Sequence, residues 1–235
     1  MTDLGRYKYP KEHQGLSVVI FGAGETARIA FRGFLYDSPY HISQFVVDDK
    51  FAGTLPNDLF GYSVSTLSDF LSKPRQSTYA VFVAFSAKNL SQDRAERIEV
   101  LSAKGIELIS YVSSRAFVDH DVTINRNVMV LENNTLQSEV AIGAGTLVWS
   151  GNHIGHQTVI GENNFISSHV CIGGQAKIGK QNYFGMNCTV RDTVTLSDHI
   201  VIGSNSFVNK DIFSAGVYVG TPAKILEGRD PRLSI

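Results

Sequence analysis

One apolar position recurs every six residues through the second half of the chain. The series has sixteen members and no insertion, and each member is aliphatic or phenylalanine. A period of six matches neither the 3.6-residue period of an α-helix nor the two-residue alternation of a β-strand. A fixed hexad is typical of a β-solenoid, in which each hexad makes one short strand and one corner. The members are Val118, Ile124, Val130, Leu136, Ile142, Val148, Ile154, Ile160, Ile166, Ile172, Ile178, Phe184, Val190, Leu196, Ile202 and Val208.

The hexads predict a left-handed parallel β-helix over residues 113–210. Three hexads would close one triangular coil of 18 residues, and seven of the apolar positions are followed directly by glycine. Small residues or asparagines precede several apolar positions, as at Thr158, Asn164, Ala176 and Asn182. We expect these residues at tight corners, where left-handed backbone is tolerated.

Residues 16–112 follow a different pattern, in which strand and helix signals alternate. Short apolar runs at 17–22, 44–49, 79–85 and 107–112 predict strands, and the segments ETARIAFRGFL and DRAERIEVLSAKG predict helices. This rhythm predicts a small parallel, Rossmann-like α/β sheet. The expected class is therefore α/β plus all-β. Its parts are a lead-in (1–15), the α/β domain (16–112), the β-helix domain (113–210) and a C-terminal extension (211–235).

Composition excludes several classes of function. The net charge is −1, which gives no electrostatic footprint for nucleic acid. The first fifteen residues are polar, so we expect no signal peptide, and no apolar run approaches the roughly 18 residues of a membrane helix. Cys171 and Cys188 form no disulfide framework, so a reducing, cytoplasmic location is expected.

Several motifs resemble one enzyme family. The hexads, LVWSGNHIGHQTVIGENNFISSHVCIGG (147–174) and VYVGTPAKIL (217–226) together resemble the hexapeptide acyltransferases. VVIFGAGETARIAFRGFL (18–35), FVVDDK (45–50) and LFGYSVSTL (59–67) resemble the nucleotide-binding domain fused to one branch of them, the bacterial sugar N-acyltransferases. The resemblance covers roughly residues 16 to 226. It implies a homotrimer that transfers an acetyl or other short acyl group from coenzyme A to the amine of a nucleotide-linked amino sugar, for surface glycan synthesis.

The resemblance also implies a catalytic base. The family's histidine stands two residues after a hexad position, which here is His156 after Ile154. An imidazole suits this role because its unperturbed pKa lies near neutral pH. By contrast, His153 and His169 do not fall on the family's catalytic position, and we expect them to be surface or cleft-lining residues.

The neighbours of His156 depart from the family pattern. The acidic residue that usually follows the histidine is Gln157 here. Glu139 stands one coil before Gln157, and adjacent coils lie about 4.8 Å apart, so Glu139 is a candidate to reach the imidazole directly. The alternative is that Glu139 is a solvated charge and that a backbone carbonyl orients the ring. Gly174 stands one coil after His156 and matches the glycine whose N–H serves the thioester carbonyl in the family. Phe165 replaces a second histidine and would make the acyl pocket more apolar.

The resemblance assigns further binding residues. The turn GAGETA follows a predicted strand and opens a helix, so Gly22, Ala23 and Gly24 would hold a phosphate or sugar hydroxyl at the helix N-terminus. The same nucleotide-sugar crevice would include Asp48, Asp49, Phe85 and Ser86, which end the next strands. Lys224 would lie near the adenosine end of coenzyme A.

Four alternatives remain open at this stage. A sugar O-acetyltransferase would use the same fold on a hydroxyl. A γ-class carbonic anhydrase would need three histidines; His120 and His156 have its 36-residue spacing, but Gly161 occupies the third position. An NAD-dependent oxidoreductase is disfavoured because about 97 residues leave no room for both dinucleotide-binding halves. A non-catalytic sensor built on both domains is the fourth.

Overall fold

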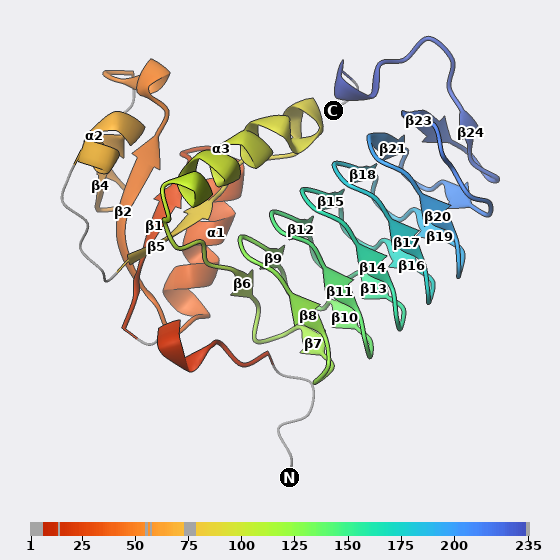
Figure 1. The fold of residues 1–235 in the computed structure, drawn as a ribbon, viewed down its shortest axis with the longest axis horizontal. Coiled ribbons are helices and arrows are strands. Elements are labelled where there is room, and N and C mark those ends of the chain that lie inside the picture. The colour runs from red at the N-terminus through yellow and green to blue at the C-terminus, as the bar shows by residue number, and fades with distance from the viewer. Residues whose placement is uncertain (1–6, 14, 55, 57, 73–78, 234–235) are drawn as a thin grey trace.

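The computed structural model describes residues 7–13, 15–54, 56, 58–72 and 79–233. Part of the expected lead-in, residues 1–6 and 14, lies outside this range. The rest of the lead-in includes a 3₁₀-helix, η1 (Lys11–His13), and the hydroxyl of Tyr9 donates to the carbonyl of Val112 at 2.9 Å. An α/β unit stands at one end of the molecule, and a stack of triangular coils leads away from it (Figure 1).

The N-terminal unit contains a five-stranded sheet of order β3-β4-β2-β1-β5, parallel except for the β3–β4 hairpin. One face is covered by α1 (Glu25–Tyr36), and the other by α2 (Leu67–Ser72) and α3 (Gln92–Ala103). Short 3₁₀-helices η2 (Asp49–Phe51) and η3 (Lys88–Ser91) follow β2 and β5. The strands are β1 (Ser17–Phe21), β2 (His41–Val47), β3 (Asp58–Leu59), β4 (Tyr62–Thr66) and β5 (Tyr79–Val83).

Three of the four strands expected in this unit are confirmed, and the fourth is divided. Residues 107–109 lie beside β5 through one bridge between Val81 and Leu108. The chain then leaves the sheet, and β6 (Tyr111–Val112) pairs with β9 of the β-helix. The predicted strand 107–112 was therefore wrong as a single element, because its two halves pair with different sheets. The hairpin β3–β4 and helix α2 were not foreseen.

The second half of the chain forms a parallel β-helix with three faces. All sixteen hexad positions lie in strands β7 to β22, and all are buried except the half-buried Ile124. Each strand pairs in parallel with strands one 18-residue coil away, so the apolar side chains stack into one continuous core.

Each face is one sheet. Face 1 consists of β7 (Phe117–Val118), β10 (Thr135–Leu136), β13 (His153–Ile154), β16 (Cys171–Ile172), β19 (Thr189–Val190) and β22 (Phe207–Val208). Face 2 consists of β8 (Thr123–Ile124), β11 (Ala141–Ile142), β14 (Val159–Ile160), β17 (Lys177–Ile178) and β20 (Thr195–Leu196). Face 3 consists of β6, β9 (Met129–Val130), β12 (Leu147–Val148), β15 (Phe165–Ile166), β18 (Tyr183–Phe184), β21 (Ile200–Ile202), β23 (Gly216–Val219) and β24 (Lys224–Ile225). A last 3₁₀-helix, η4 (Pro231–Leu233), follows.

We name the corners of the coil by the faces that they join. Corner A joins faces 1 and 2 and holds residues 119–122, 137–140, 155–158, 173–176 and 191–194. Corner B joins faces 2 and 3 and holds residues 125–128, 143–146, 161–164, 179–182 and 197–199. Corner C joins faces 3 and 1 and holds residues 113–116, 131–134, 149–152, 167–170, 185–188 and 203–206.

The left-handed residues of the corners lie one position before the predicted ones. Gln157, Asn163, Gln175 and Gln181 have φ between 52° and 60°. The residues expected there, Thr158, Asn164, Ala176 and Asn182, instead point into the coil and are buried. The equivalent inward position of other corners holds buried valines, as at Val140 and Val170, so it accepts apolar residues as well as amides.

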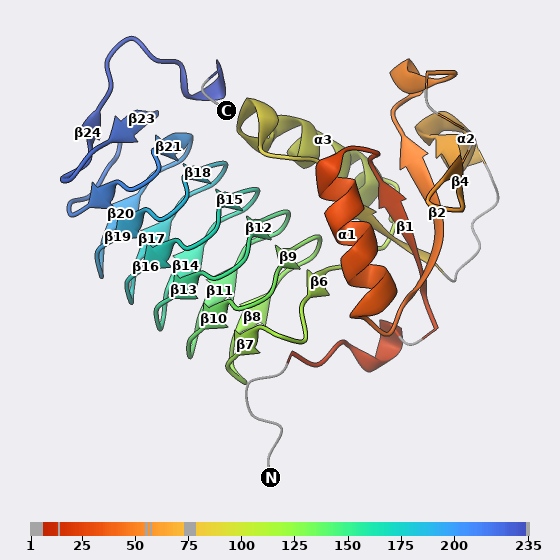
Figure 2. The same cartoon turned by 180° about the vertical axis from the view of Figure 1, so that it is seen from behind.

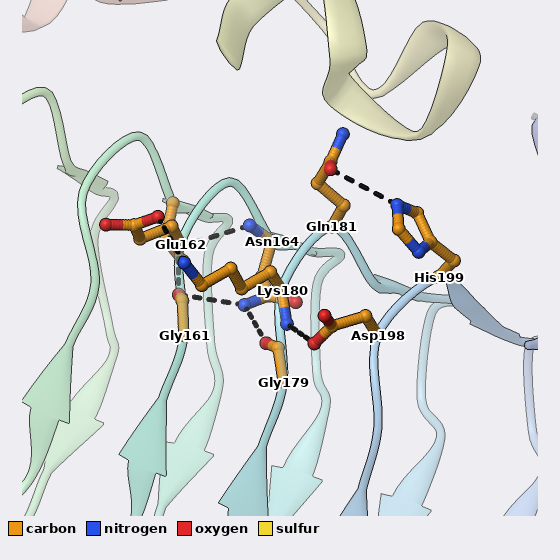
Figure 3. A network of polar contacts seen from close by, with 9 residues as sticks. Gly161, Glu162, Asn164, Gly179, Lys180, Gln181, Asp198 and His199 are labelled. Atoms are coloured by element: carbon orange, nitrogen blue, oxygen red, sulfur yellow. Dashed lines mark hydrogen bonds and ion pairs between the residues drawn. The ribbon is translucent and has the colours of Figure 1, made fainter. Parts of the chain in front are cut away.

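The buried amides form ladders between coils. At corner B the Asn164 Oδ1 accepts from the backbone N–H of Asn182 at 2.9 Å, and its Nδ2 donates to the carbonyls of Gly161 and Gly179 at 2.8 Å (Figure 3). Outside this ladder, Lys180 pairs with Glu162 at 3.0 Å. Each corner is therefore tied to the next coil by side chains as well as by strands.

The N-terminal unit packs against face 3. Met129, Leu147 and Phe165 project from that face into the same apolar cluster as Phe34 and Phe82, and α1 lies beside β6 (Figure 2). In the part of the chain that the structure describes, no helix has the length and apolar character needed to cross a membrane.

Arg94 of α3 joins the two units at corner B. Its side chain is fully buried, and burial lowers the pKa of the guanidinium to about 9, which leaves it charged at neutral pH. Every N–H group of the guanidinium donates to an oxygen atom, either in the segment from Phe85 to the end of η3 or at corner B. The acceptors are the carbonyls of Gly145 (2.7 Å), Phe85 and Ser86 (2.8 Å each), Asn163 and Asn164 (3.3 Å each) and the hydroxyl of Ser91 (2.7 Å).

We predict that Arg94→Met lowers the free energy of unfolding by about 3 kcal/mol or more, because it leaves several buried carbonyls without a donor. Urea denaturation followed by circular dichroism measures the loss. Arg28→Met on the exposed side of α1 is the control and should change stability by less than about 0.5 kcal/mol. Equal losses in the two variants would contradict the assignment of Arg94 as the junction clamp.

Candidate active site

His156 lies at corner A, between β13 and β14, and its side chain is exposed. Its backbone is fixed on both sides: its N–H donates to the Gln137 Oε1 at 3.0 Å, and its carbonyl accepts from the N–H of Gln175 at 2.7 Å. The ring nitrogen Nδ1 is 3.3 Å from the Gln157 Oε1. The exposed ring is thus held at a fixed place on the edge of the β-helix.

The other ring nitrogen faces Gly174 on the next coil. A Cβ atom built on Gly174 would lie 2.7 Å from the imidazole Nε2, closer than real Cβ contacts. Among the described residues, the backbone N–H of Gly174 has no hydrogen-bond partner. Gly174 therefore leaves both the space that the imidazole occupies and a free donor beside Nε2.

Glu139 does not take the place that the sequence suggested for it. Its carboxylate Oε2 accepts from the Gln157 Nε2 at 3.3 Å, and it is the Gln157 amide oxygen that approaches His156. Gln175 adds a third member, because its Nε2 donates to the Gln157 Oε1 at 3.0 Å. The reason is geometric. One column of left-handed corner residues, spaced one coil apart, contains Glu139, Gln157 and Gln175. His156 belongs to the neighbouring column.

Sequence reasoning missed the contributions of Gln137 and Gln175 to this site. Gln175 lies one coil after Gln157, so the 18-residue spacing contained its signal, whereas Gln137 lies one coil before Gly155 and reaches His156 diagonally. That spacing places the residues in adjacent columns. It does not give the direction in which each side chain turns, and this direction decides the contacts.

The remaining histidines lie elsewhere. His153 is exposed on β13, and His169 is exposed at corner C, under Gly151. His120 lies at corner A two coils before His156, and its Nδ1 is 2.7 Å from the Asp119 Oδ1. Ligand atoms of Asp119, His120 and Asp121 lie within 4.8 Å of one another, but this exposed group does not include His156. Gly161, the third position of the carbonic anhydrase alternative, lies at corner B and has no side chain.

The GAGETA turn has the expected strand–turn–helix form. Gly22 directly follows β1 and has a φ of +137°, and a Cβ atom there would lie 3.0 Å from the carbonyl oxygen of Ala84. Gly24 is the N-cap of α1 and supplies no side-chain cap, so the first N–H groups of the helix point outward from an exposed turn. Phe85 is half-buried against Phe21, and Ser86 is exposed.

The two aspartates assigned to this crevice are used by the fold. Asp48 is buried and pairs with the Arg97 Nε at 2.7 Å, which raises the pKa of the Arg97 guanidinium. Asp49 accepts from the N–H and the hydroxyl of Ser68 at 3.0 and 2.8 Å, and these bonds lower the pKa of its carboxyl. Asp48 ties β2 to α3 and Asp49 caps α2, because helices on this face bring donors to the ends of the strands.

Phe165 and Lys224 are also distant from His156. Phe165 follows His156 by half a coil, so it lies on face 3, where its ring stacks on Tyr183 at 5.4 Å and is buried under the N-terminal unit. Lys224 is exposed on β24, beyond β22. On face 1, β22 is three strands from β13, or about 14 Å along the coil axis.

Two cavities lie between the units. One of about 590 Å³ separates α1 from corner C, and one of about 640 Å³ separates α3 from corner B. His156 lines neither. Corner A is the corner that does not border face 3, so within one chain His156 lies away from the face on which the N-terminal unit packs.

Comparison with known proteins gives structural relatives only. The sequence matches no family model and no curated protein. A variant of perosamine N-acetyltransferase from Caulobacter crescentus, in complex with CoA and GDP-perosamine, superposes with a TM-score of 0.80 at 19% identity, over 89% of this chain and 96% of that one. The acetyltransferase domain of PglB from Neisseria gonorrhoeae, in complex with acetyl coenzyme A, has a TM-score of 0.77 at 19% identity, over 89% and 98%. WeeI from Acinetobacter baumannii has 0.73 at 22%, over 90% and 100%. These similarities establish a shared fold across both units.

We predict that Asp119→Asn lowers the pKa of His120. The hydrogen bond to Asp119 and the charges of Asp119 and Asp121 favour the protonated ring and raise its pKa above 6.5, so removing the largest contribution should return the value toward 6.5. NMR titration of the ring protons measures the midpoint. Asp198→Asn at corner B is the control, and a His120 midpoint that moves equally in both variants would show that the contact with Asp119 is not the cause.

Proposed function

We propose that the chain is a CoA-dependent N-acyltransferase that transfers an acetyl or other short acyl group to the amine of a nucleotide-linked amino sugar, for bacterial surface glycan synthesis. The observation that carries the proposal is the position of the His156 Nε2 at corner A. It lies against Gly174, which has no side chain to displace the ring and whose backbone N–H has no partner among the described residues. The fold supports it, because relatives with both units are a perosamine N-acetyltransferase and an acetyltransferase domain that were solved with CoA or acetyl coenzyme A.

In the proposed reaction the His156 Nε2 is the general base. It accepts the proton that the sugar amine loses as nitrogen bonds to the thioester carbonyl carbon. The N–H of Gly174 donates to the carbonyl oxygen as negative charge develops there. When the C–S bond breaks, the imidazolium returns the proton to the departing sulfur, which restores neutral His156 and gives an amide and free CoA.

The N-terminal unit is the proposed acceptor site. In the turn of Gly22, Ala23 and Gly24, the N–H groups of Ala23 and Gly24 and the N-terminus of α1 are offered to a diphosphate, whereas the N–H of Gly22 donates to the carbonyl of Val46 at 2.8 Å. Phe85 and Ser86 border the turn, and their carbonyls are fixed by Arg94. We leave Asp48 and Asp49 out of this site because their carboxylates are already engaged. The fold of this unit as a Rossmann-like domain is part of the proposal.

We further propose a homotrimer of left-handed β-helices with acyl-CoA in the cleft between neighbours. The support is that the N-terminal unit packs on face 3, whereas His156 of the same chain lies at the corner that does not border this face. A neighbouring copy would bring its corner A to the acceptor at the GAGETA turn. Lys224, on the last coils, would then meet the nucleotide end of CoA.

We predict that His156→Asn lowers kcat by about 10²- to 10⁴-fold and leaves the KM for acyl-CoA nearly unchanged, because the variant loses only the proton acceptor. The assay is thiol release from acetyl-CoA with GDP-, UDP- and dTDP-linked amino sugars. His153→Asn, an exposed histidine on the adjacent strand, is the control. Retention of most of kcat in His156→Asn would refute the catalytic assignment. Release only with sugars that lack an amine would favour an O-acetyltransferase, and no release with any donor or acceptor would favour a binding protein.

We predict that Gly174→Ala lowers kcat by at least about tenfold while the fold is kept, because the added Cβ must displace the imidazole. Kinetics of the single variants and of the double variant with His156→Asn measure the coupling. In the His156→Asn background, Gly174→Ala should lower kcat little further. Additive losses would mean that Gly174 acts independently of His156.

A further inference from the structure

We propose that Gln157 is a positioning residue that relays the charge of Glu139 to His156, so that an amide replaces the direct carboxylate–imidazole pair at corner A. The inference rests on the proposed function, because it concerns the state of the base in that reaction. In this arrangement Glu139 acts on the ring through the Gln157 amide and does not contact the ring directly.

The orientation of the Gln157 amide is set by its neighbours. A carboxylate is an acceptor only, so the Glu139 Oε2 at 3.3 Å requires the amide NH₂ of Gln157 on that side. The amide oxygen is then directed to His156 and also accepts from the Gln175 Nε2 at 3.0 Å. The reversed amide would set oxygen against the Glu139 carboxylate and NH₂ against the NH₂ of Gln175. The Glu139 carboxylate therefore selects the orientation, and the Gln175 amide is turned to match it.

This orientation selects the tautomer of His156. The Gln157 oxygen cannot donate, so the ring nitrogen that faces it, Nδ1, carries the proton. The lone pair is then on Nε2, which faces Gly174 and the proposed reaction centre. The relay presents His156 as a base without any rearrangement of the ring.

The Gln157 amide also weakens the electrostatic effect of the Glu139 carboxylate on the imidazole, because it stands between the two groups. Corner A offers a comparison in the same molecule, because His120 contacts the Asp119 carboxylate directly at 2.7 Å and that contact raises the pKa of His120. At His156 the Gln157 amide separates the ring from the Glu139 carboxylate. Glu139 would still stabilise the imidazolium formed during the reaction, but more weakly than a direct partner. The charged and titratable groups of this corner are Asp119, His120, Asp121, Glu139, Arg191 and Asp192, and the N-terminal unit of the same chain packs on the opposite face.

The kinetic test compares the pH profiles of kcat/KM. Glu139→Gln should move the rising limb to lower pH, because it removes a negative charge that favours the imidazolium, and lower kcat about 3- to 10-fold with little change in KM. Gln157→Glu should move the limb to higher pH, because it puts a carboxylate against Nδ1. Glu162→Gln is the control, because Glu162 lies at corner B, where it forms an ion pair with Lys180 of the next coil (Figure 3). An unchanged profile in Glu139→Gln, or an equal shift in Glu162→Gln, would overturn the relay.

A second measurement does not depend on acyl transfer. ¹⁵N NMR of the imidazole in the full-length protein at about pH 8 should report the Nδ1–H tautomer for His156 and a mixture in Gln157→Leu, with the fold checked by circular dichroism. A predominant Nε2–H tautomer in the parent protein, or no change in the leucine variant, would refute the relay whether or not the protein is an acyltransferase. If the parent protein shows the Nδ1–H tautomer but releases no thiol with any substrate, the positioning role stands and the proposed function fails.

Discussion

The stacking of two-residue strands at an interval of 18 residues is the constraint on which the rest of this structure depends. Each apolar hexad residue lies directly over its counterpart on the next coil, and from Asn127 onward each corner is turned by a left-handed residue. With no insertion anywhere in the series, every side chain belongs to a straight column. A single inserted residue would move all later side chains out of their columns and break both the core and the amide ladders.

The candidate active site is a direct consequence of these columns. One column of corner A brings His156 over Gly174, and its neighbour brings Glu139, Gln157 and Gln175 into contact. The backbone between them is fixed by parallel pairing, so the site is rigid without a large buried pocket. The site is exposed at the edge of the coil, which suits a cleft completed by a second copy of the chain.

Several residues have contacts that the sequence pattern did not suggest, each for an identifiable physical reason. Phe165 was assigned to the acyl pocket, but half a coil separates it from His156 and places it in the junction core. Asp48 and Asp49 have the position of a dinucleotide fingerprint, but α3 and α2 supply an arginine and serine donors that engage both carboxylates. The segment 107–112 has the composition of one strand, yet its halves pair with different sheets. Each of these contacts involves a partner that is distant in the sequence.

The sequence alone determined the β-helix and its register, because a six-residue period has one structural solution and each member is a local requirement for burial. It also determined which residues share a column with His156, since the coil length is a multiple of the period. Only the tertiary structure decided where the α/β unit docks, through Arg94 and face 3, and which way each corner side chain turns. Those choices depend on hydrogen-bond partners and packing surfaces that local pattern does not encode, and they leave His156 away from the face on which the α/β unit packs.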